Sequence, residues 1–304
     1  MKKLLLLLSL FVGSAFADPI KISSVWGFAV GSTQGTYYRA ILDQANKEQS
    51  KYEFVFENKP GAGGAIAAQY VHNQSPKVAI LAHSPAFFVR PNLYPDTPYS
   101  FDQFKPLMVL GYAPAALVTK NKSLETLLKQ DKITFGTAGT GSSTHLMAEA
   151  FVNEIKDRTK KDIAMVHYSN TIEAMTAVMG GHVDATFEYL GDARGRATPN
   201  TVLIGITGKD KVEGVSPLSG MGFKNMAAIS GVIHIVTNAS TPDATVTEIQ
   251  TILLKAEKTS VVQAMYKRDY NSKDAYLQVP NDLTDWYKKK IELYKSVTKD
   301  IKVK

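Results

Sequence analysis

Two glycine-rich stretches of this chain combine residue types that suit anion binding. They run from Glu57 to Gly64 and from Gly136 to His145, and each follows a strand-like run and opens an apolar, helix-like one. The N-terminus of a helix offers unpaired N–H groups and a partial positive charge, and glycine lets a ligand approach that backbone closely. The two stretches therefore predict a binding cleft for an anion.

The second stretch resembles a phosphate-binding loop that lacks one part. Gly136 and Gly141 have the spacing of G-x-x-x-x-G-K-[ST], but Ser142 stands where that motif has its lysine. Without the lysine charge we expect no nucleoside triphosphate. A smaller anion, such as a carboxylate, fits the pattern better.

Cysteine and histidine usage limits the other chemistry. The chain has no cysteine, which excludes disulfides, thiolate metal ligands and thiol nucleophiles. It has six histidines, and no two of them are spaced as in H-E-x-x-H. We therefore expect no metal site and no cofactor.

The first 17 residues have the pattern of a secretory signal peptide. Lys2 and Lys3 precede an apolar run at 4–12, and Ala15-Phe16-Ala17 supplies a small-residue cleavage site. The apolar run is too short to span a bilayer, although an uncleaved anchor is the alternative. Since no cysteine follows, the protein is not lipidated, and we expect a mature periplasmic chain that begins at Asp18.

The rest of the chain alternates strand-like with helix-like runs. Alternation of this kind predicts an α/β fold with mainly parallel sheets flanked by helices, and the length suits two domains. Four prolines punctuate residues 91–106, which we expect to be mostly loop. The net charge of +7 owes much to lysines in the last, helical stretch, which is typical of a solvated face, so no nucleic-acid partner is expected. Strands are predicted at 20–26, 52–56, 78–82, 115–119, 133–136, 164–168, 183–188, 202–207 and 231–237, and helices at 37–45, 65–71, 144–158, 171–180, 242–256 and 283–301.

Four segments resemble one known family, the Bug-type extracytoplasmic solute receptors of tripartite tricarboxylate transporters. Residues 57–64 are similar to its E-N-[KR]-P-G-A-G-G, and residues 136–146 to its G-[ST]-A-G-x-G-S-x-x-H-L. Residues 92–106 are similar to a-L-Y-p-x-x-P-Y…F-x-P, and residues 166–184 to V-x-Y…G-G-x-V-D. The segments occur in family order along nearly the whole mature chain.

The resemblance implies a two-domain periplasmic binding protein of type II, the Venus-flytrap class. The chain would cross between domains near Pro114 and near Gly231, so that domain 1 comprises 18–115 plus 234–304 and domain 2 comprises 116–233. A small organic carboxylate would bind in the cleft between them. Receptors of this family are not enzymes; this one would be a monomer that delivers its ligand to a two-component membrane permease.

The first loop departs from the family pattern P-F-x-x-G-G-x-x-D-x-x-x-R. Aligned on Arg39, the chain has Gly27, Ser32 and Gly35 in place of the proline, the second glycine and the aspartate. The departure leaves the fold expectation intact. It leaves open which carboxylate is bound, because this loop touches the ligand in the family.

The resemblance and the strand ends together give the candidate ligand-binding residues. In each case a structural role is the alternative: a turn or N-cap for the second glycine-rich stretch, a helix-start contact for His145, and a surface acid paired with Arg194 or Arg196 for Glu188. Gly61, Ala62 and Gly63 are expected to shape the chain. The candidates are Phe28, Ala29, Gly31, Ser32, Thr33, Ser84, Thr137, Thr140, Gly141, Ser142, Ser143, His145, Tyr168 and Glu188.

Two other functions are compatible with these residues. An exported serine hydrolase would use Ser142 or Ser143 with His145, although neighbours on one helical turn poorly suit a nucleophile and its base, and no G-x-S-x-G is present. A ligand-binding partner of a membrane sensor would have the same sequence features as a transport receptor.

Overall fold

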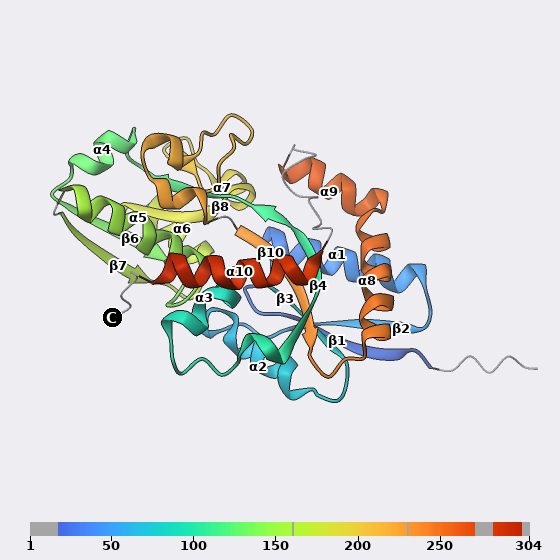
Figure 1. Ribbon diagram of the computed structural model, residues 1–304. Coiled ribbons are helices and arrows are strands. Elements are labelled where there is room, and N and C mark those ends of the chain that lie inside the picture. The colour runs from blue at the N-terminus through green and yellow to red at the C-terminus, as the bar shows by residue number, and fades with distance from the viewer. Residues whose placement is uncertain (1–17, 160, 230, 271–281, 300–304) are drawn as a thin grey trace, which may run out of the picture.

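The computed structural model describes residues 18–159, 161–229, 231–270 and 282–299, which build two five-stranded sheets with helices packed on them (Figure 1). The predicted signal peptide at 1–17 and Ile301 of the last predicted helix lie outside the described residues. Within the described ranges, no helix has the length and apolar character needed to cross a bilayer.

The first sheet has the strand order β2-β1-β3-β10-β4. β1 pairs in parallel with β2 and β3, and β10 runs antiparallel to both of its neighbours, so four strands share one direction. The strands are β1 (Ile20–Trp26), β2 (Tyr52–Asn58), β3 (Ala79–His83), β4 (Phe104–Ala113) and β10 (Gly231–Asn238).

The second sheet repeats this arrangement in the order β7-β6-β8-β5-β9. β6 is parallel to β7 and β8, whereas β5 is antiparallel to β8 and β9. The chain passes from the first sheet to the second at Pro114, between β4 and β5. The strands are β5 (Ala115–Thr119), β6 (Lys132–Thr137), β7 (Asp162–His167), β8 (Ala185–Tyr189) and β9 (Val202–Ile206).

Helices cover the sheets and create two lobes, each named here for its sheet. The first lobe holds α1 (Thr33–Glu48), α2 (Ala65–Asn73), α3 (Ala86–Leu93), α8 (Asp243–Glu257), α9 (Ser260–Tyr270) and α10 (Leu283–Thr298). The second holds α4 (Leu124–Lys129), α5 (Ser143–Thr159), α6 (Thr171–Gly180) and α7 (Leu190–Arg196). Short 3-10 turns are η1 (Ala62–Gly64), η2 (Phe101–Gln103), η3 (Leu218–Met221) and η4 (Lys224–Ala227).

The central strands are apolar on both faces because helices cover both. In β3, Ile80 and Ala82 join the cluster that contains α1, whereas Ala79 and Leu81 join the cluster that contains α2, α3 and α10. All four side chains are fully buried. Strands buried on two faces have continuous apolar runs, which is the pattern that the sequence shows here.

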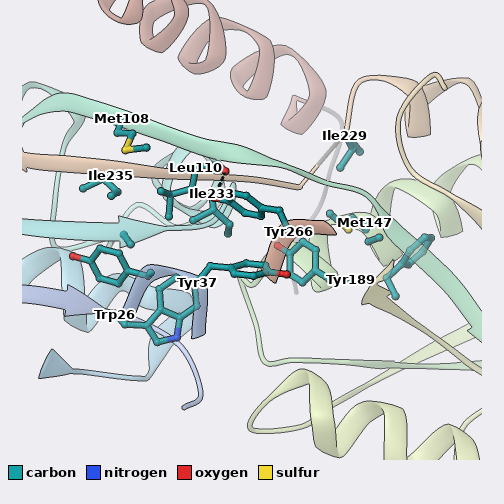
Figure 2. Close-up of a cluster of buried hydrophobic side chains, with 14 of the residues drawn as sticks. Trp26, Tyr37, Met108, Leu110, Met147, Tyr189, Ile229, Ile233, Ile235 and Tyr266 are labelled. Atoms are coloured by element: carbon teal, nitrogen blue, oxygen red, sulfur yellow. Dashed lines mark hydrogen bonds between the residues drawn. The ribbon is translucent and has the colours of Figure 1, made fainter. Parts of the chain in front are cut away.

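One apolar cluster is continuous through both lobes. It runs from Trp26 at the end of β1 to Met147 of α5 and Tyr189 of β8, as Figure 2 shows. Tyr266 of α9 lies inside it, and its hydroxyl donates a hydrogen bond to the Leu110 carbonyl at 3.2 Å. The lobes therefore share buried surface.

The predicted α/β class and mainly parallel sheets are confirmed, but the prediction of a loop over 91–106 is wrong. Residues 86–93 form α3 with Pro91 inside it. Pro91 cannot donate to the Phe87 carbonyl, and the Tyr99 hydroxyl donates to that carbonyl instead, at 3.0 Å. β4 contains Pro106, which is tolerated because β4 is an edge strand whose register with β10 shifts beside it.

Candidate functional site

A cleft of about 890 Å³ lies between the two sheets. Most of its lining follows the carboxyl ends of strands: β1 and β2 in the first sheet, and β6, β7 and β8 in the second. Trp26 pairs with Asn58 in register, and Thr137 with His167, so neighbouring strands end together. Open α/β sheets bind ligands at such edges.

The lining combines aromatic, glycine and polar residues. Its members are Trp26, Gly27, Phe28, Ala29, Val30, Ser32, Gln34, Asn58, Pro60, Gly61, Ala62, Gly63, Gly64, Arg90, Tyr94, Asp96, Ala138, Gly139, Thr140, Tyr168, Ser169, Asn170, Thr171, Ile172, Tyr189, Asp192, Arg196 and Ile233.

Asn58 holds the loop between β1 and α1 against the cleft. Its side-chain amide donates to the Trp26 carbonyl at 3.1 Å and to the Phe28 carbonyl at 2.7 Å. Ser32 then caps α1 by accepting a hydrogen bond from the Gly35 amide at 3.2 Å. These hydrogen bonds hold the loop where Phe28 and Ser32 line the cleft wall.

The departure from the family pattern at Gly35 has a steric cause. A Cβ atom at this position would lie 2.8 Å from the indole nitrogen of Trp26. That nitrogen donates to the Ala29 carbonyl at 3.3 Å, inside the same loop. A side chain at position 35 would displace Trp26, so this loop and the family's aspartate are incompatible.

The first glycine-rich stretch lines the cleft with its main chain. Residues 61–64 have φ angles of 127°, 47°, 62° and 91°, a left-handed run that glycine adopts and other residues rarely do. A Cβ at Gly64 would lie 2.2 Å from Nε2 of His83, so only glycine fits there. Burial lowers the pKa of His83 to about 4 and keeps its ring neutral.

The second glycine-rich stretch meets the first across the cleft. Gly139 and Gly141 are left-handed, with φ of 76° and 78°. A Cβ at Gly63 would lie 2.9 Å from the Gly141 carbonyl oxygen, so the two lobes approach through bare main chain at this point. Thr140, between the two left-handed glycines, lines the cleft, whereas Gly141 does not.

The serines at the start of α5 are buried under the first lobe. Ser142 is the helix cap, because its hydroxyl accepts from the His145 amide at 3.1 Å. The Ser143 hydroxyl lies 2.8 Å from the Ser84 hydroxyl and accepts from the Ala86 amide at 3.2 Å. These three serines are at most 4% exposed and do not line the cleft.

His145 contacts the backbone and an acid, and neither ring nitrogen is hydrogen-bonded to a serine. Its Nδ1 accepts from the Gly141 amide at 3.0 Å, which places the ring hydrogen on Nε2, 3.4 Å from Glu149 Oε1. His167 packs edge-on against it and bonds Thr137 at 2.7 Å. His145 is therefore not placed to act as a base for Ser142 or Ser143. This disfavours the serine hydrolase hypothesis.

Glu188 is fully buried, so its interpretation as a surface acid is wrong. Arg196 pairs instead with Asp192, at 3.1 Å, and Arg194 with Glu213. Burial, reinforced by the charge of Asp192, raises the pKa of Glu188 to about 8. Burial therefore favours the protonated, neutral form of the Glu188 carboxyl.

Asp192 makes a bond across the cleft that the sequence analysis did not foresee. It lies on α7 of the second lobe, and its Oδ1 accepts from the Thr33 amide at 3.2 Å and from the Thr33 hydroxyl at 2.5 Å. Asp192 is 6% exposed and lines the cleft. Its position just after β8 was the available signal, because helices that follow parallel strands begin at the binding edge.

Five of the fourteen candidate residues line the cleft: Phe28, Ala29, Ser32, Thr140 and Tyr168. The other nine lie outside the lining: Gly31, Thr33, Ser84, Thr137, Gly141, Ser142, Ser143, His145 and Glu188. Ligand contact stays a prediction for all fourteen. Polar lining residues that the sequence analysis did not name as candidates include Asn58, Arg90, Asn170, Thr171, Asp192 and Arg196.

Comparison with known proteins places this cleft in a family context. The model of the tripartite tricarboxylate transporter family receptor matches residues 38–294. A UPF0065 protein of Bordetella bronchiseptica is 28% identical over 200 residues, 61% of this chain and 58% of that relative. The chain thus spans a little over half the length of the curated relatives that it matches.

Solved structures share the fold. The periplasmic binding protein BugD aligns with a TM-score of 0.78 at 19% identity, covering 92% of this chain and 97% of BugD. MatC from Rhodopseudomonas palustris, solved with bound malate, aligns with a TM-score of 0.77 at 20% identity, covering 92% and 99%. The predicted two-domain fold of periplasmic binding proteins is confirmed.

Ser142 and Thr140 are predicted to affect stability differently. Ser142→Ala removes the cap of α5 and should lower the free energy of unfolding by about 1 kcal/mol. Thr140→Ala, two residues away on the cleft wall, should change it by less than about 0.5 kcal/mol. Urea unfolding followed by circular dichroism measures both. Equal losses would show that Ser142 does not act as the cap.

The buried carboxyl of Glu188 should make stability depend on pH. Its folded-state pKa of about 8 exceeds the ordinary 4.5, so its contribution is complete below about pH 4.5 and is lost as the pH rises through 8. Glu188→Gln cannot ionise. Its unfolding free energy relative to wild type should rise with pH by up to about 1.4 kcal/mol per unit between about pH 5 and pH 8.

Urea unfolding at four pH values across this window tests the Glu188 prediction. Glu292→Gln, at an exposed acid of α10, is the matched control and should follow the wild-type profile. Parallel profiles for Glu188→Gln and wild type would contradict a protonated, buried carboxyl.

Proposed function

We propose that this chain, which belongs to the tripartite tricarboxylate transporter receptor family, captures a small organic carboxylate in its cleft as a periplasmic receptor. The observation that carries the proposal is the cleft itself, which strand ends and helix starts of both lobes line together. Such a site encloses a small ligand between two surfaces that separate when the lobes move apart.

The cleft wall supplies donors for a carboxylate from the second lobe. Residues 169–172 at the start of α6 line it, and Asn170 caps this helix by accepting from the Glu173 amide at 2.9 Å. The Glu173 carboxylate accepts from the Ser169 amide at 3.1 Å and from the Asn170 side-chain amide at 3.0 Å. The main-chain amides of Thr171 and Ile172, in the first turn of α6, are therefore the donors that this helix start offers to the cleft. Thr140 adds a hydroxyl beside it.

The first lobe contributes main-chain groups and one cation. The left-handed run at 61–64 lines the cleft, and among its amides only that of Gly64 donates a main-chain hydrogen bond, to the Gly61 carbonyl. Arg90 lies over the Tyr94 ring at 4.7 Å and reaches toward the Thr140 carbonyl at 3.5 Å. A micromolar ligand requires about 8 kcal/mol, which roughly four to six charge-assisted hydrogen bonds provide.

Binding without conversion agrees with the contacts of the polar residues. His145 is held by Gly141 and Glu149, and Ser142 acts as a helix cap, so neither is free for acyl transfer. The malate in MatC supports a carboxylate as the ligand class. We further propose that the monomeric receptor delivers its ligand to a two-component membrane permease, with lobes bounded at 18–115 plus 234–304 and 116–233.

Carboxylate capture predicts stabilisation by ligand. Unfolded and refolded protein, freed of any carried ligand, should gain about 2.7 kcal/mol at one hundred times Kd, or a few degrees in Tm. A thermal-shift screen of mono-, di- and tricarboxylates measures this. Mass spectrometry of the released ligand should find it unchanged. No shift with any carboxylate, or conversion of the ligand, would contradict the proposal.

Thr140→Ala should weaken binding of the carboxylate found in that screen by about tenfold, the loss of one charge-assisted hydrogen bond. Thr126→Ala, at an exposed threonine of α4 outside the cleft lining, is the matched control and should bind within about threefold of wild type. Isothermal titration calorimetry compares the two. Unchanged affinity in Thr140→Ala would remove this residue from the site.

A further inference from the structure

The cleft contains a carboxylate of the protein's own. Asp192 reaches from α7 to the first residue of α1, where Oδ1 accepts both the amide and the hydroxyl hydrogen of Thr33, at 3.2 and 2.5 Å. Arg196 approaches the same oxygen at 3.1 Å. These are the partners that a ligand carboxylate would take at a helix start.

Asp192 and Ser32 occupy two main-chain donors at the start of α1, whereas Nε2 of Gln34, buried on the cleft wall, has no hydrogen-bond partner among the described residues. The Gly35 amide already donates to the Ser32 hydroxyl, and the Thr33 amide to Asp192. Arg196, a cation of the cleft wall, is paired with Asp192. A ligand carboxylate arriving here would meet a like charge and would have to displace a bonded one.

The charges of the cleft wall lead to the same conclusion. Its charged side chains are Arg90, Arg196, Asp96 and Asp192, two cations and two anions. With Arg196 paired to Asp192, Arg90 is the cation left to meet a ligand carboxylate, and it lies across the cleft beside Thr140. One ligand carboxylate therefore has a cation to meet, and a second one meets Asp192.

We infer that Asp192 selects ligands by their charge. It occupies the anion position at the start of α1, so that the cleft binds monocarboxylates in preference to dicarboxylates of the same chain length. The inference rests on the proposed function, because it names the ligand class of that same cleft. It sets this receptor apart from the neighbour that was solved with malate.

Pairs of ligands matched in chain length test the inference. Isothermal titration calorimetry on refolded protein compares butyrate with succinate and hexanoate with adipate. Of butyrate and hexanoate, the acid that wild type binds more tightly should bind at least tenfold more tightly than the dicarboxylate of the same chain length. Asp192→Asn keeps the side-chain size and removes the charge, and it should raise dicarboxylate affinity at least tenfold while the monocarboxylate stays within threefold.

Two further variants keep this test decisive. Asp192→Ser vacates the position and should shift the ratio in the same direction, which guards against an Asn variant that fails to fold. Asp131→Asn removes one negative charge at an exposed position outside the cleft wall and should leave the ratio unchanged. Circular dichroism verifies the fold of each.

The outcomes separate the inference from the proposed function. A wild-type preference for dicarboxylates, an unchanged ratio in both Asp192 variants, or an equal shift in Asp131→Asn would overturn the role of Asp192 while carboxylate capture stands. If wild type binds none of these four acids and no acid of the broader screen, the proposed function itself is overturned.

Discussion

The cleft depends on one property of the main chain: a helix that begins where a parallel strand ends leaves N–H groups without partners. Both sheets of this protein direct such junctions toward the same space, after β1 and β2 on one side and after β6 and β7 on the other. These donors belong to the backbone, and glycine lets a ligand approach the backbone closely. Such a site therefore depends more on glycine than on charged side chains. The composition of the wall, rich in glycine and containing only two arginines, follows from this.

The lobes meet through small residues for the same reason. Gly63 and Gly141 approach through bare main chain, and the short side chains of Ser84 and Ser143 bond each other directly. Larger side chains at these points would hold the lobes apart. The consequence is that the helix start of α5 lies beneath the first lobe, while the exposed donors of the cleft come from Thr140 and the start of α6.

Two acids, Glu188 at the end of β8 and Asp192 in α7, lie in different surroundings near the cleft. Glu188 is fully buried, and burial raises its pKa to about 8, which favours the neutral form. Asp192 has the Thr33 donors and Arg196 around one oxygen. Of the two acids, Asp192 is therefore the one whose contacts cross between the lobes.

The sequence by itself determined the α/β class, most strand positions and the two glycine-rich junctions, because these are local patterns of periodicity and backbone freedom. The tertiary structure decided what depends on distant partners. Pro91 lies inside a helix where the Tyr99 hydroxyl supplies the donor that Pro91 lacks, and Pro106 lies in β4, a strand at the edge of its sheet. The fold also buries Ser142 and His145, which the sequence patterns predicted to contact the ligand. It also joined Asp192 to Thr33, 159 residues away, a contact that packing of the two lobes alone creates.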